Sequence, residues 1–114
     1  MNIDNMPLND IWEEIEKRAN ENPELIKDMN ASYAFDITGK EGGMYQLAFK
    51  DGNAYVQEGS SDADCTLSLN GKNFRKLLQG NLNATTAFMT GRLKVKGNIG
   101  LALKLEELLK KYSI

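Results

Sequence analysis

The sequence predicts an α+β fold in which helices cover a five-stranded, mainly antiparallel sheet. Three observations lead to this prediction. Apolar residues recur at helical spacing near the start of the chain, alternate with polar residues between positions 33 and 69, and return to helical spacing after position 70. One late alternating segment, 92–96, interrupts the second helical region. Helices, a run of strands, and helices around one late strand are typical of helices layered on a sheet.

The composition indicates a single globular domain over residues 1–114. Hydrophobic residues make up 41% of the chain and charged residues 26%, which is ordinary for a globular protein. A chain of this length buries about two-thirds of its unfolded surface, so it can hold a core without disulfides. The single cysteine allows no internal disulfide, which favours a reducing, cytoplasmic location.

Residues 7–19 predict an amphipathic helix. Pro7 suits the first helical position, where no backbone donor is needed. The apolar side chains that follow share one face, and they are Leu8, Ile11, Trp12, Ile15 and Ala19. Asn22 and Pro23 then predict the start of a second, short helix.

Alternation of apolar and polar residues predicts four consecutive strands. The segments with this pattern are 33–38, 45–50, 53–58 and 65–69. A glycine-rich turn at 39–43 joins the first pair, Asp51-Gly52 predicts a tight hairpin, and 59–62 predicts a loop. Short turns between consecutive strands favour antiparallel pairing with one covered face.

Asparagine residues mark the starts of the later helices. Asn70 and Asn83 are suited to cap two short helices, which Gly80 and Gly91 end. Asn98 predicts the start of a last helix that runs close to the C-terminus.

The charge is distributed unevenly along the chain. Residues 1–64 hold 5 Lys and Arg against 14 Asp and Glu, whereas residues 65–114 hold 9 against 2. Two interpretations stay open: the halves neutralise each other in the fold, or a basic surface meets anionic groups. The outward side of the predicted strand 92–96 contributes Arg92, Lys94 and Lys96. An acidic total, with aromatic residues placed for burial, argues against a nucleic-acid partner.

The sequence lacks the residue constellations that most enzymatic sites need. There is no histidine, which removes the commonest general base and metal ligand. Cys65 is interpreted as a small buried side chain rather than a nucleophile. The carboxylate pair Glu106-Glu107 is interpreted as solvated surface, and Asp62 with Asp64 offers too few oxygens for calcium. We therefore expect no catalytic site, no metal and no cofactor, and predict that the chain is not an enzyme.

The last helix carries more apolar residues than one stripe requires. That stripe contains Leu101, Leu105, Leu108 and Tyr112. Ile99 and Leu103 fall outside it, although a surface helix normally buries a face only about 100° wide. Either the helix packs deep in a core, or part of its surface lines an apolar cavity. Such cavities stay dry and accept apolar ligands.

Two segments resemble the sterol carrier protein type two family. The more specific one reads Phe88-Met89-Thr90-Gly91-Arg92-Leu93-Lys94-Val95-Lys96-Gly97-Asn98-Ile99 and continues to Leu105. The other reads Asp64-Cys65-Thr66-Leu67-Ser68-Leu69. The order of the predicted elements is similar to that of the family over nearly the full length.

The resemblance implies an apolar lipid cavity between sheet and helices. The expected ligands are fatty acids, fatty acyl-CoAs, phospholipids, or sterol-like or isoprenoid lipids, bound and transferred without catalysis. By position in the family, the resemblance implies that the cavity is lined by Leu47, Phe49, Phe74, Leu78, Phe88, Met89, Ile99, Leu103, Leu105 and Leu109. Arg92, Lys94 and Lys96 would contact an anionic headgroup or membrane surface.

Two hypotheses about function follow. The first is a lipid-binding and lipid-transfer domain whose partners are the lipid itself and, transiently, an anionic membrane. The alternative is an accessory domain that presents a lipid substrate to a partner enzyme.

Overall fold

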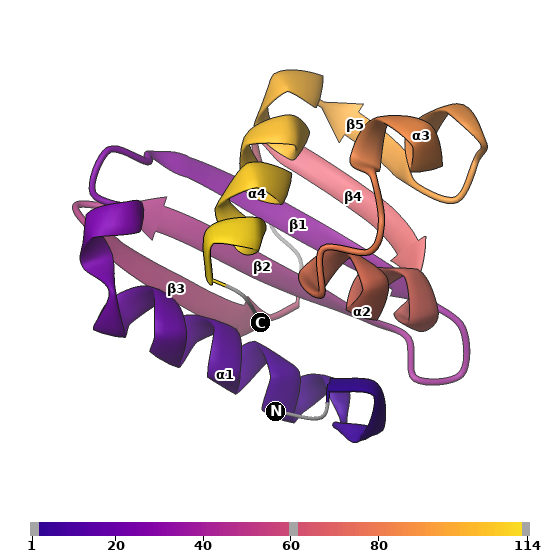
Figure 1. The fold of residues 1–114 in the computed structure, drawn as a ribbon, viewed down its shortest axis with the longest axis horizontal. Helices are drawn as coiled ribbons and strands as arrows, with labels where there is room; N and C mark the ends of the chain where they lie inside the picture. Colours follow the sequence, from indigo (N-terminus) through magenta and orange to yellow (C-terminus); the bar gives the residue numbers. More distant parts are fainter. Residues whose placement is uncertain (1–2, 60–61, 113–114) are drawn as a thin grey trace.

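The computed structural model describes residues 3–59 and 62–112. Figure 1 shows helices and strands in the predicted order. The helical elements are η1 (Ile3–Asn5), α1 (Leu8–Glu21), η2 (Pro23–Leu25), α2 (Gly71–Leu78), α3 (Ala84–Met89) and α4 (Ile99–Tyr112). The strands are β1 (Ala31–Thr38), β2 (Gly43–Lys50), β3 (Asn53–Glu58), β4 (Cys65–Asn70) and β5 (Lys94–Gly97). The predicted α+β fold with a five-stranded sheet is confirmed.

The strands form one sheet in the order β3-β2-β1-β4-β5. The pairs β1–β2, β2–β3 and β4–β5 are antiparallel, whereas β1 and β4 run parallel. Because β2 and β3 lie between β1 and β4 in the chain, no tight turn joins β1 to β4, and parallel pairing is possible. A tight turn can join only antiparallel neighbours, and parallel neighbours need a long crossover. The sheet is therefore mixed, although mainly antiparallel as predicted.

Helices cover one face of this sheet (Figure 1). Alternate residues of β1 point toward them, so that Tyr33, Phe35 and Ile37 are buried. The ring of Trp12 from α1 lies at the centre of an aromatic cluster. Its centroid is 5.0 Å from that of Phe35 and 5.1 Å from that of Phe74. Such ring pairs contribute about 0.5–1.5 kcal/mol beyond their buried area.

Helix α1 also covers the exposed edge of β3. The side-chain amide of Asn20 accepts a hydrogen bond from Ala54 N (2.8 Å) and donates one to Ala54 O (3.0 Å). The carboxylate of Glu16 accepts from Val56 N at 2.7 Å. These polar side chains form hydrogen bonds with backbone groups of β3 that could otherwise pair with another strand.

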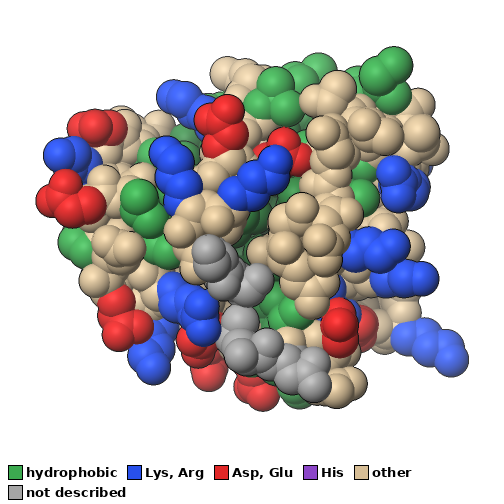
Figure 2. All heavy atoms as spheres, viewed as in Figure 1, with side chains coloured by type: hydrophobic (Ala, Val, Ile, Leu, Met, Phe, Trp, Pro, Cys, Tyr) green, Lys and Arg blue, Asp and Glu red, His purple; other side chains and the backbone are tan. Residues whose placement is uncertain are grey.

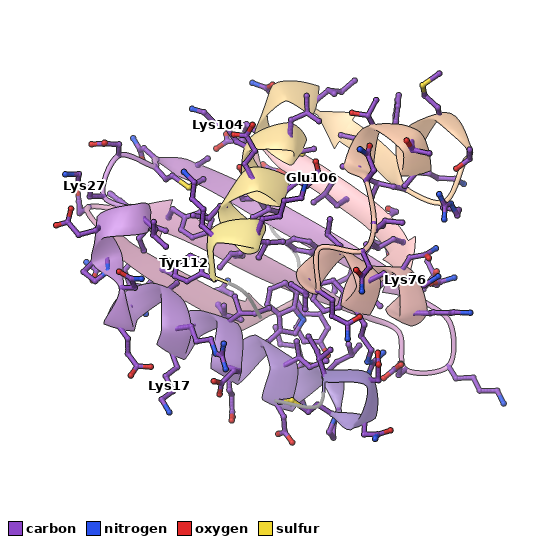
Figure 3. The ribbon with its side chains drawn as sticks, viewed as in Figure 1. Lys17, Lys27, Lys76, Lys104, Glu106 and Tyr112 are labelled. Carbon is purple, nitrogen blue, oxygen red and sulfur yellow. The ribbon has the colours of Figure 1, made fainter. Side chains whose placement is uncertain are left out.

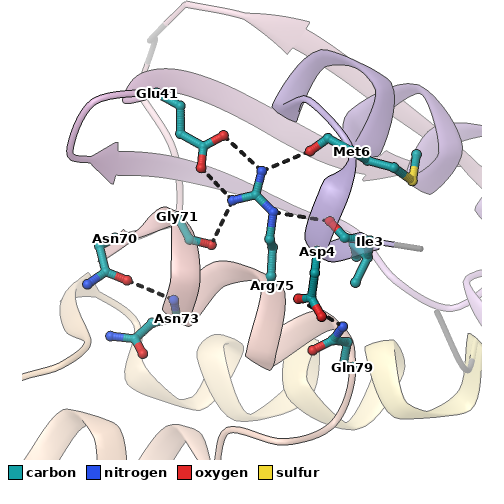
Figure 4. Close-up of polar contacts among 9 residues, drawn as sticks. All are labelled: Ile3, Asp4, Met6, Glu41, Asn70, Gly71, Asn73, Arg75 and Gln79. Carbon is teal, nitrogen blue, oxygen red and sulfur yellow. Dashed lines mark hydrogen bonds and ion pairs between the residues drawn. The ribbon is translucent and has the colours of Figure 1, made fainter. Parts of the chain in front are cut away.

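Arg75 of α2 joins the N-terminal segment to the sheet (Figure 4). Its guanidinium donates to the backbone oxygens of Ile3 (3.1 Å) and Met6 (2.8 Å), and pairs with both carboxylate oxygens of Glu41 at 2.6 and 2.8 Å. This bidentate geometry is the strong form of an ion pair. The contact with Arg75 lowers the pKa of the Glu41 carboxyl from its usual value.

The capping predictions for α2 and α3 are confirmed. Asn70 Oδ1 accepts a hydrogen bond from Asn73 N at 2.7 Å, and Asn83 Oδ1 accepts one from Thr86 N at 3.0 Å. The predicted loop at 59–62 lies partly outside the described residues.

Several local predictions differ from the structure. Pro7 is the N-cap of α1 rather than its first residue, and β1 and β2 each begin two residues earlier than predicted. The short helix expected after Asn22 is a single 3₁₀ turn, η2, whose bonds run from Leu25 N to Asn22 O and from Ile26 N to Pro23 O. The fifth strand begins at Lys94 rather than at position 92. The reason is that the backbone N–H groups of residues 92 and 93 both donate to Ala87 O, which keeps them in the turn that ends α3.

Among residues 3–59 and 62–112, no helix is long and apolar enough to cross a membrane.

Candidate functional site

An apolar pocket of about 150 Å³ lies between α3, β5 and the first turns of α4. Its lining consists of Ala84, Thr85, Phe88, Leu93, Val95, Ile99, Ala102 and Leu103. Thr85 is the one residue of this lining with a polar side-chain group. A pocket with this lining can hold an apolar chain but offers little polar recognition.

Local sequence rules place three elements around the pocket. Asn83 starts α3 and Gly91 ends it with a positive φ of 81°, so that the chain reverses into β5. Within and just before β5, alternation directs Leu93 and Val95 inward. On α4, Ile99 and Leu103 are four residues apart and therefore lie on one side of the helix.

The rim of the pocket exposes large apolar side chains. Leu103 is 42% exposed, Phe88 42% and Ile99 49%, while Met89 at the end of α3 is 79% exposed. We call the part of the molecule formed by α3, β5 and the first turns of α4 the α3 corner. Figure 2 shows hydrophobic side chains over this corner, at the upper right, with Lys and Arg side chains along the right edge below them. Clustered exposed apolar residues mark interaction sites more often than singly scattered ones do.

The structure brings together three of the ten residues proposed for the cavity. Phe88, Ile99 and Leu103 line the pocket, whereas Met89 is exposed and is not among its lining residues. The other six are packed in the buried core and do not line this pocket: Leu47, Phe49, Phe74, Leu78, Leu105 and Leu109.

A buried carboxylate holds α3 against α4. Glu106, labelled in Figure 3, is 9% exposed, and its Oε2 accepts a hydrogen bond from the backbone N–H of Ala84. The prediction that Glu106 is solvated surface is wrong. Adjacent helical residues point in different directions, so Glu106 turns toward α3 while Glu107 stays exposed. A carboxylate at a helix N-terminus satisfies donors that the helix itself cannot.

The three predicted basic residues lie beside the pocket, on the other side of β5. Lys94 pairs with Ser68 and Lys96 with Thr66 across the β4–β5 ladder, which places them on the outward face of the sheet. Arg92 precedes the strand, and all three side chains are exposed. None of them forms an ion pair with another described residue.

The described residues offer few groups for chemistry. Within 3–59 and 62–112, no group of three or more His, Cys, Asp or Glu could hold a metal ion. Burial raises the pKa of the Cys65 thiol, so the thiolate needed for nucleophilic attack is disfavoured. Burial likewise raises the pKa of Tyr33 to about 12, and its hydroxyl donates to Leu101 O at 2.8 Å. Both groups therefore stay protonated at neutral pH.

Sequence reasoning missed the small residues of the pocket. Ala84 and Ala102 leave room where larger side chains would fill the space. Ala102 lies three residues after Ile99 and one before Leu103, so helical spacing contained a signal for it. The sequence contained no comparable signal for Ala84 and Thr85, because their position at the pocket depends on how α3 packs on α4.

Comparison with known proteins bears on the family and the fold of this chain. The model of the SCP-2 sterol transfer family matches residues 12–110. Hydroxysteroid dehydrogenase-like protein 2 of Xenopus tropicalis is 40% identical over 108 residues, which cover 93% of this chain and 25% of that protein. The chain thus spans about a quarter of the length of this relative.

Solved structures share the fold. Sterol carrier protein 2 from Yarrowia lipolytica, in its apo form, aligns with a TM-score of 0.75 and 32% identity, covering 90% of this chain and 89% of that one. Sterol carrier protein-2 from Aedes aegypti, solved with the C16 fatty acid palmitate, aligns with a TM-score of 0.67 and 21% identity, covering 86% and 93%. At that lower identity the likeness shows the fold alone. On the family match and the Yarrowia likeness together, the chain belongs to the SCP-2 sterol transfer family.

Proposed function

We propose that this protein binds lipids by holding their apolar hydrocarbon tails between α3, β5 and α4. It transfers these lipids without catalysis. The observation that carries the proposal is the pocket itself, which combines an almost wholly apolar lining with exposed Phe88, Ile99 and Leu103 at its rim. Each buried methylene contributes about 0.8 kcal/mol, so an acyl chain can bind strongly with little polar recognition. The Aedes aegypti protein with its bound palmitate is a precedent within the fold.

The size of the pocket limits what it can hold in this conformation. About 150 Å³ is below the roughly 300–1,000 Å³ of most small-molecule sites. A long acyl chain therefore requires the pocket to widen, and α3 is the element best suited to move. It is only six residues long, and Phe88 and Met89 at its end are exposed, although the Glu106 carboxylate holds its start. If the pocket widens inward, core residues such as Leu105 and Leu109 become part of its wall.

We propose fatty acyl or isoprenoid chains as ligands and no reaction on them. The absence of histidine from the sequence and the raised pKa of the buried Cys65 thiol support this proposal. The single cysteine also supports the proposed cytoplasmic location.

Native mass spectrometry of gently purified protein, followed by organic extraction, tests the binding. We expect a mass excess that disappears on extraction and yields an identifiable acyl or isoprenoid lipid. The proposal would be refuted if the measured mass were that of the protein without lipid and the protein, at micromolar concentration, also failed to bind a fluorescent fatty-acid probe.

We also propose transient contact with an anionic membrane through Arg92, Lys94 and Lys96. These cations lie beside the exposed apolar rim, an arrangement suited to a negatively charged surface. Co-sedimentation with vesicles that contain phosphatidylserine should exceed that with neutral vesicles and should fall as salt rises. Equal co-sedimentation with both would contradict the contact.

A second candidate is an accessory domain that presents its lipid to an enzyme. It is favoured by one observation, that the chain matches a quarter of hydroxysteroid dehydrogenase-like protein 2. A stable complex with a partner enzyme, without lipid exchange between vesicles, would favour this candidate over free transfer.

A further inference from the structure

A second pocket, of about 310 Å³, lies between α1 and the end of β3, and we call it the β3 pocket. Figure 1 shows α1 lying along β3, with β5 at the far side of the sheet. Since β3 and β5 are the two edge strands, this pocket and the apolar pocket lie at opposite edges. Its lining consists of Asn9, Trp12, Glu13, Glu16, Tyr45, Val56, Gln57 and Glu58.

The β3 pocket is negatively charged. Three carboxylates line it, those of Glu13, Glu16 and Glu58, and its lining contains no Lys or Arg. None of the three forms an ion pair with another described residue. Tyr45 and Val56 add apolar surface beside the carboxylates. This combination suits a cation on an apolar stem, as in the side chains of arginine and lysine.

The edge of β3 presents open backbone groups at this pocket. The N–H of Val56 donates outward to Glu16, whereas that of Gly59 donates inward to Met44 O of β2. Alternation along an antiparallel pair therefore turns the N–H and C=O of Glu58 away from β2. The side chains of α1 bond to Ala54 and Val56, and within the described residues we find none bonded to the backbone of Glu58. Open groups at a sheet edge can pair with an extended peptide segment.

Trp12 provides an independent indication. It is 2% exposed and lines the pocket, and its indole N–H is buried without a hydrogen-bond partner in the part of the chain that the structure describes. Buried donors are normally paired, and an unpaired one costs free energy that an incoming acceptor restores. Ammonium and guanidinium groups only donate hydrogen bonds, whereas a peptide carbonyl accepts them. The unpaired donor therefore favours a peptide over a free organic cation.

We propose that the β3 pocket binds an extended segment of a partner protein that carries an arginine or a lysine. The cationic side chain lies among Glu13, Glu16 and Glu58, and the backbone of the segment pairs with the edge of β3 at Glu58. One carbonyl oxygen of the segment accepts a hydrogen bond from Trp12. This inference does not depend on lipid binding, and the two pockets are far enough apart in the sheet to be occupied together.

Calorimetric titration with two blocked tripeptides tests the proposal. The probes are acetyl-valyl-arginyl-valine amide and the same peptide with citrulline in place of arginine. Citrulline has nearly the same shape as arginine but no charge. We expect the arginine peptide to bind at least about tenfold more tightly. Equal affinities, or no binding of either peptide, would overturn the proposal.

The double variant Glu13→Gln/Glu58→Gln should lose this preference. Both side chains are exposed, so the variant should fold. Glu21→Gln/Glu107→Gln is the matched control, because it removes two exposed carboxylates that do not line the pocket. The control should keep the preference. If it loses as much preference as the first variant, general surface charge explains the effect and the pocket is overturned.

The NMR signal of the Trp12 indole N–H separates a peptide from a free cation. Trp12 is the single tryptophan of the sequence, so its signal is unambiguous. The arginine peptide should shift this signal, because the indole gains an acceptor, and an unshifted signal at saturation would overturn the proposed pairing. Butylguanidinium carries the same cation without a carbonyl, so it should bind at least about tenfold more weakly and leave the signal in place. Binding as tight as that of the peptide would assign the pocket to small cations and overturn the protein partner.

Discussion

The protein contains two apolar regions that differ in how closely they are packed. The ring centroid of Trp12 lies 5.0 to 5.3 Å from the ring centroids of three neighbouring aromatic residues. Every ring of this cluster is buried. At the α3 corner, by contrast, a pocket remains open and Phe88, Ile99 and Leu103 are all more than 40% exposed. Helix α4 contributes to both regions, with Leu105 in the core and Leu103 at the pocket.

This difference separates stability from binding. Close packing makes the core sensitive to every lost or added atom. A loosely covered corner contributes less to folding, and elements with few buried contacts are those that can open locally. Substitutions in the two regions should therefore have different effects, even when they change neighbouring residues of one helix.

The largest effect should follow Leu105→Asp. Leu105 is 1% exposed, so the substitution places an unpaired carboxylate in the core. We expect a loss of at least about 4 kcal/mol in the free energy of unfolding, measured by urea denaturation. A folded variant of nearly normal stability would show that this part of the core is as loosely packed as the corner.

Leu103→Asp should instead impair binding. Leu103 is 42% exposed, and its new carboxylate can reach water while making the pocket rim polar. We expect affinity for a fluorescent fatty-acid probe to fall at least about tenfold, with the melting temperature nearly unchanged. Unfolding of this variant, or undiminished binding, would contradict the separation between the two regions.

Glu106→Leu should loosen α3 and leave the rest of the fold intact. The substitution removes the acceptor for Ala84 N at the start of the helix. Losing such a cap costs about 1 kcal/mol. Hydrogen exchange should accelerate at the amides of residues 84–89 and not in β1 or β2. The variant Glu106→Gln keeps an acceptor and is the control. Uniform acceleration across the protein would indicate that α3 does not open separately.

The smallest effect concerns Glu41 and the dependence of stability on pH. Contact with Arg75 lowers the pKa of Glu41 in the folded state from its usual value of 4.5. The stabilisation is therefore complete above that usual value and is lost as pH falls through the folded-state pKa. Since the side chain of Glu41 is 47% exposed, we expect less than about 1 kcal/mol.

Urea denaturation of Glu41→Gln at neutral pH and near pH 3 measures this contribution. The wild-type protein should lose slightly more stability on acidification than the variant does. A larger loss in the variant would contradict the assigned role of the ion pair.

Sequence periodicity predicted most of the fold because hydrophobic spacing is local information. Trp12 and its helix, the alternating strands, and the caps at Asn70 and Asn83 all follow from residues close together in the chain. The parallel pairing of β1 with β4 did not follow, because nothing near either strand specifies a partner more than 30 residues away. The boundaries of the domain stay a prediction, since the matched relative is longer than this chain.

By itself, the sequence determined which side chains are apolar, where the helices begin, and that no histidine is present. It also indicated a surplus of apolar residues in α4. Only the tertiary structure decided how this surplus is divided. Leu105 packs against residues from distant parts of the chain, whereas Leu103 faces α3, which is too short and too small to cover it. Burial depends on what lies opposite a side chain, and that is a property of the whole fold rather than of any segment.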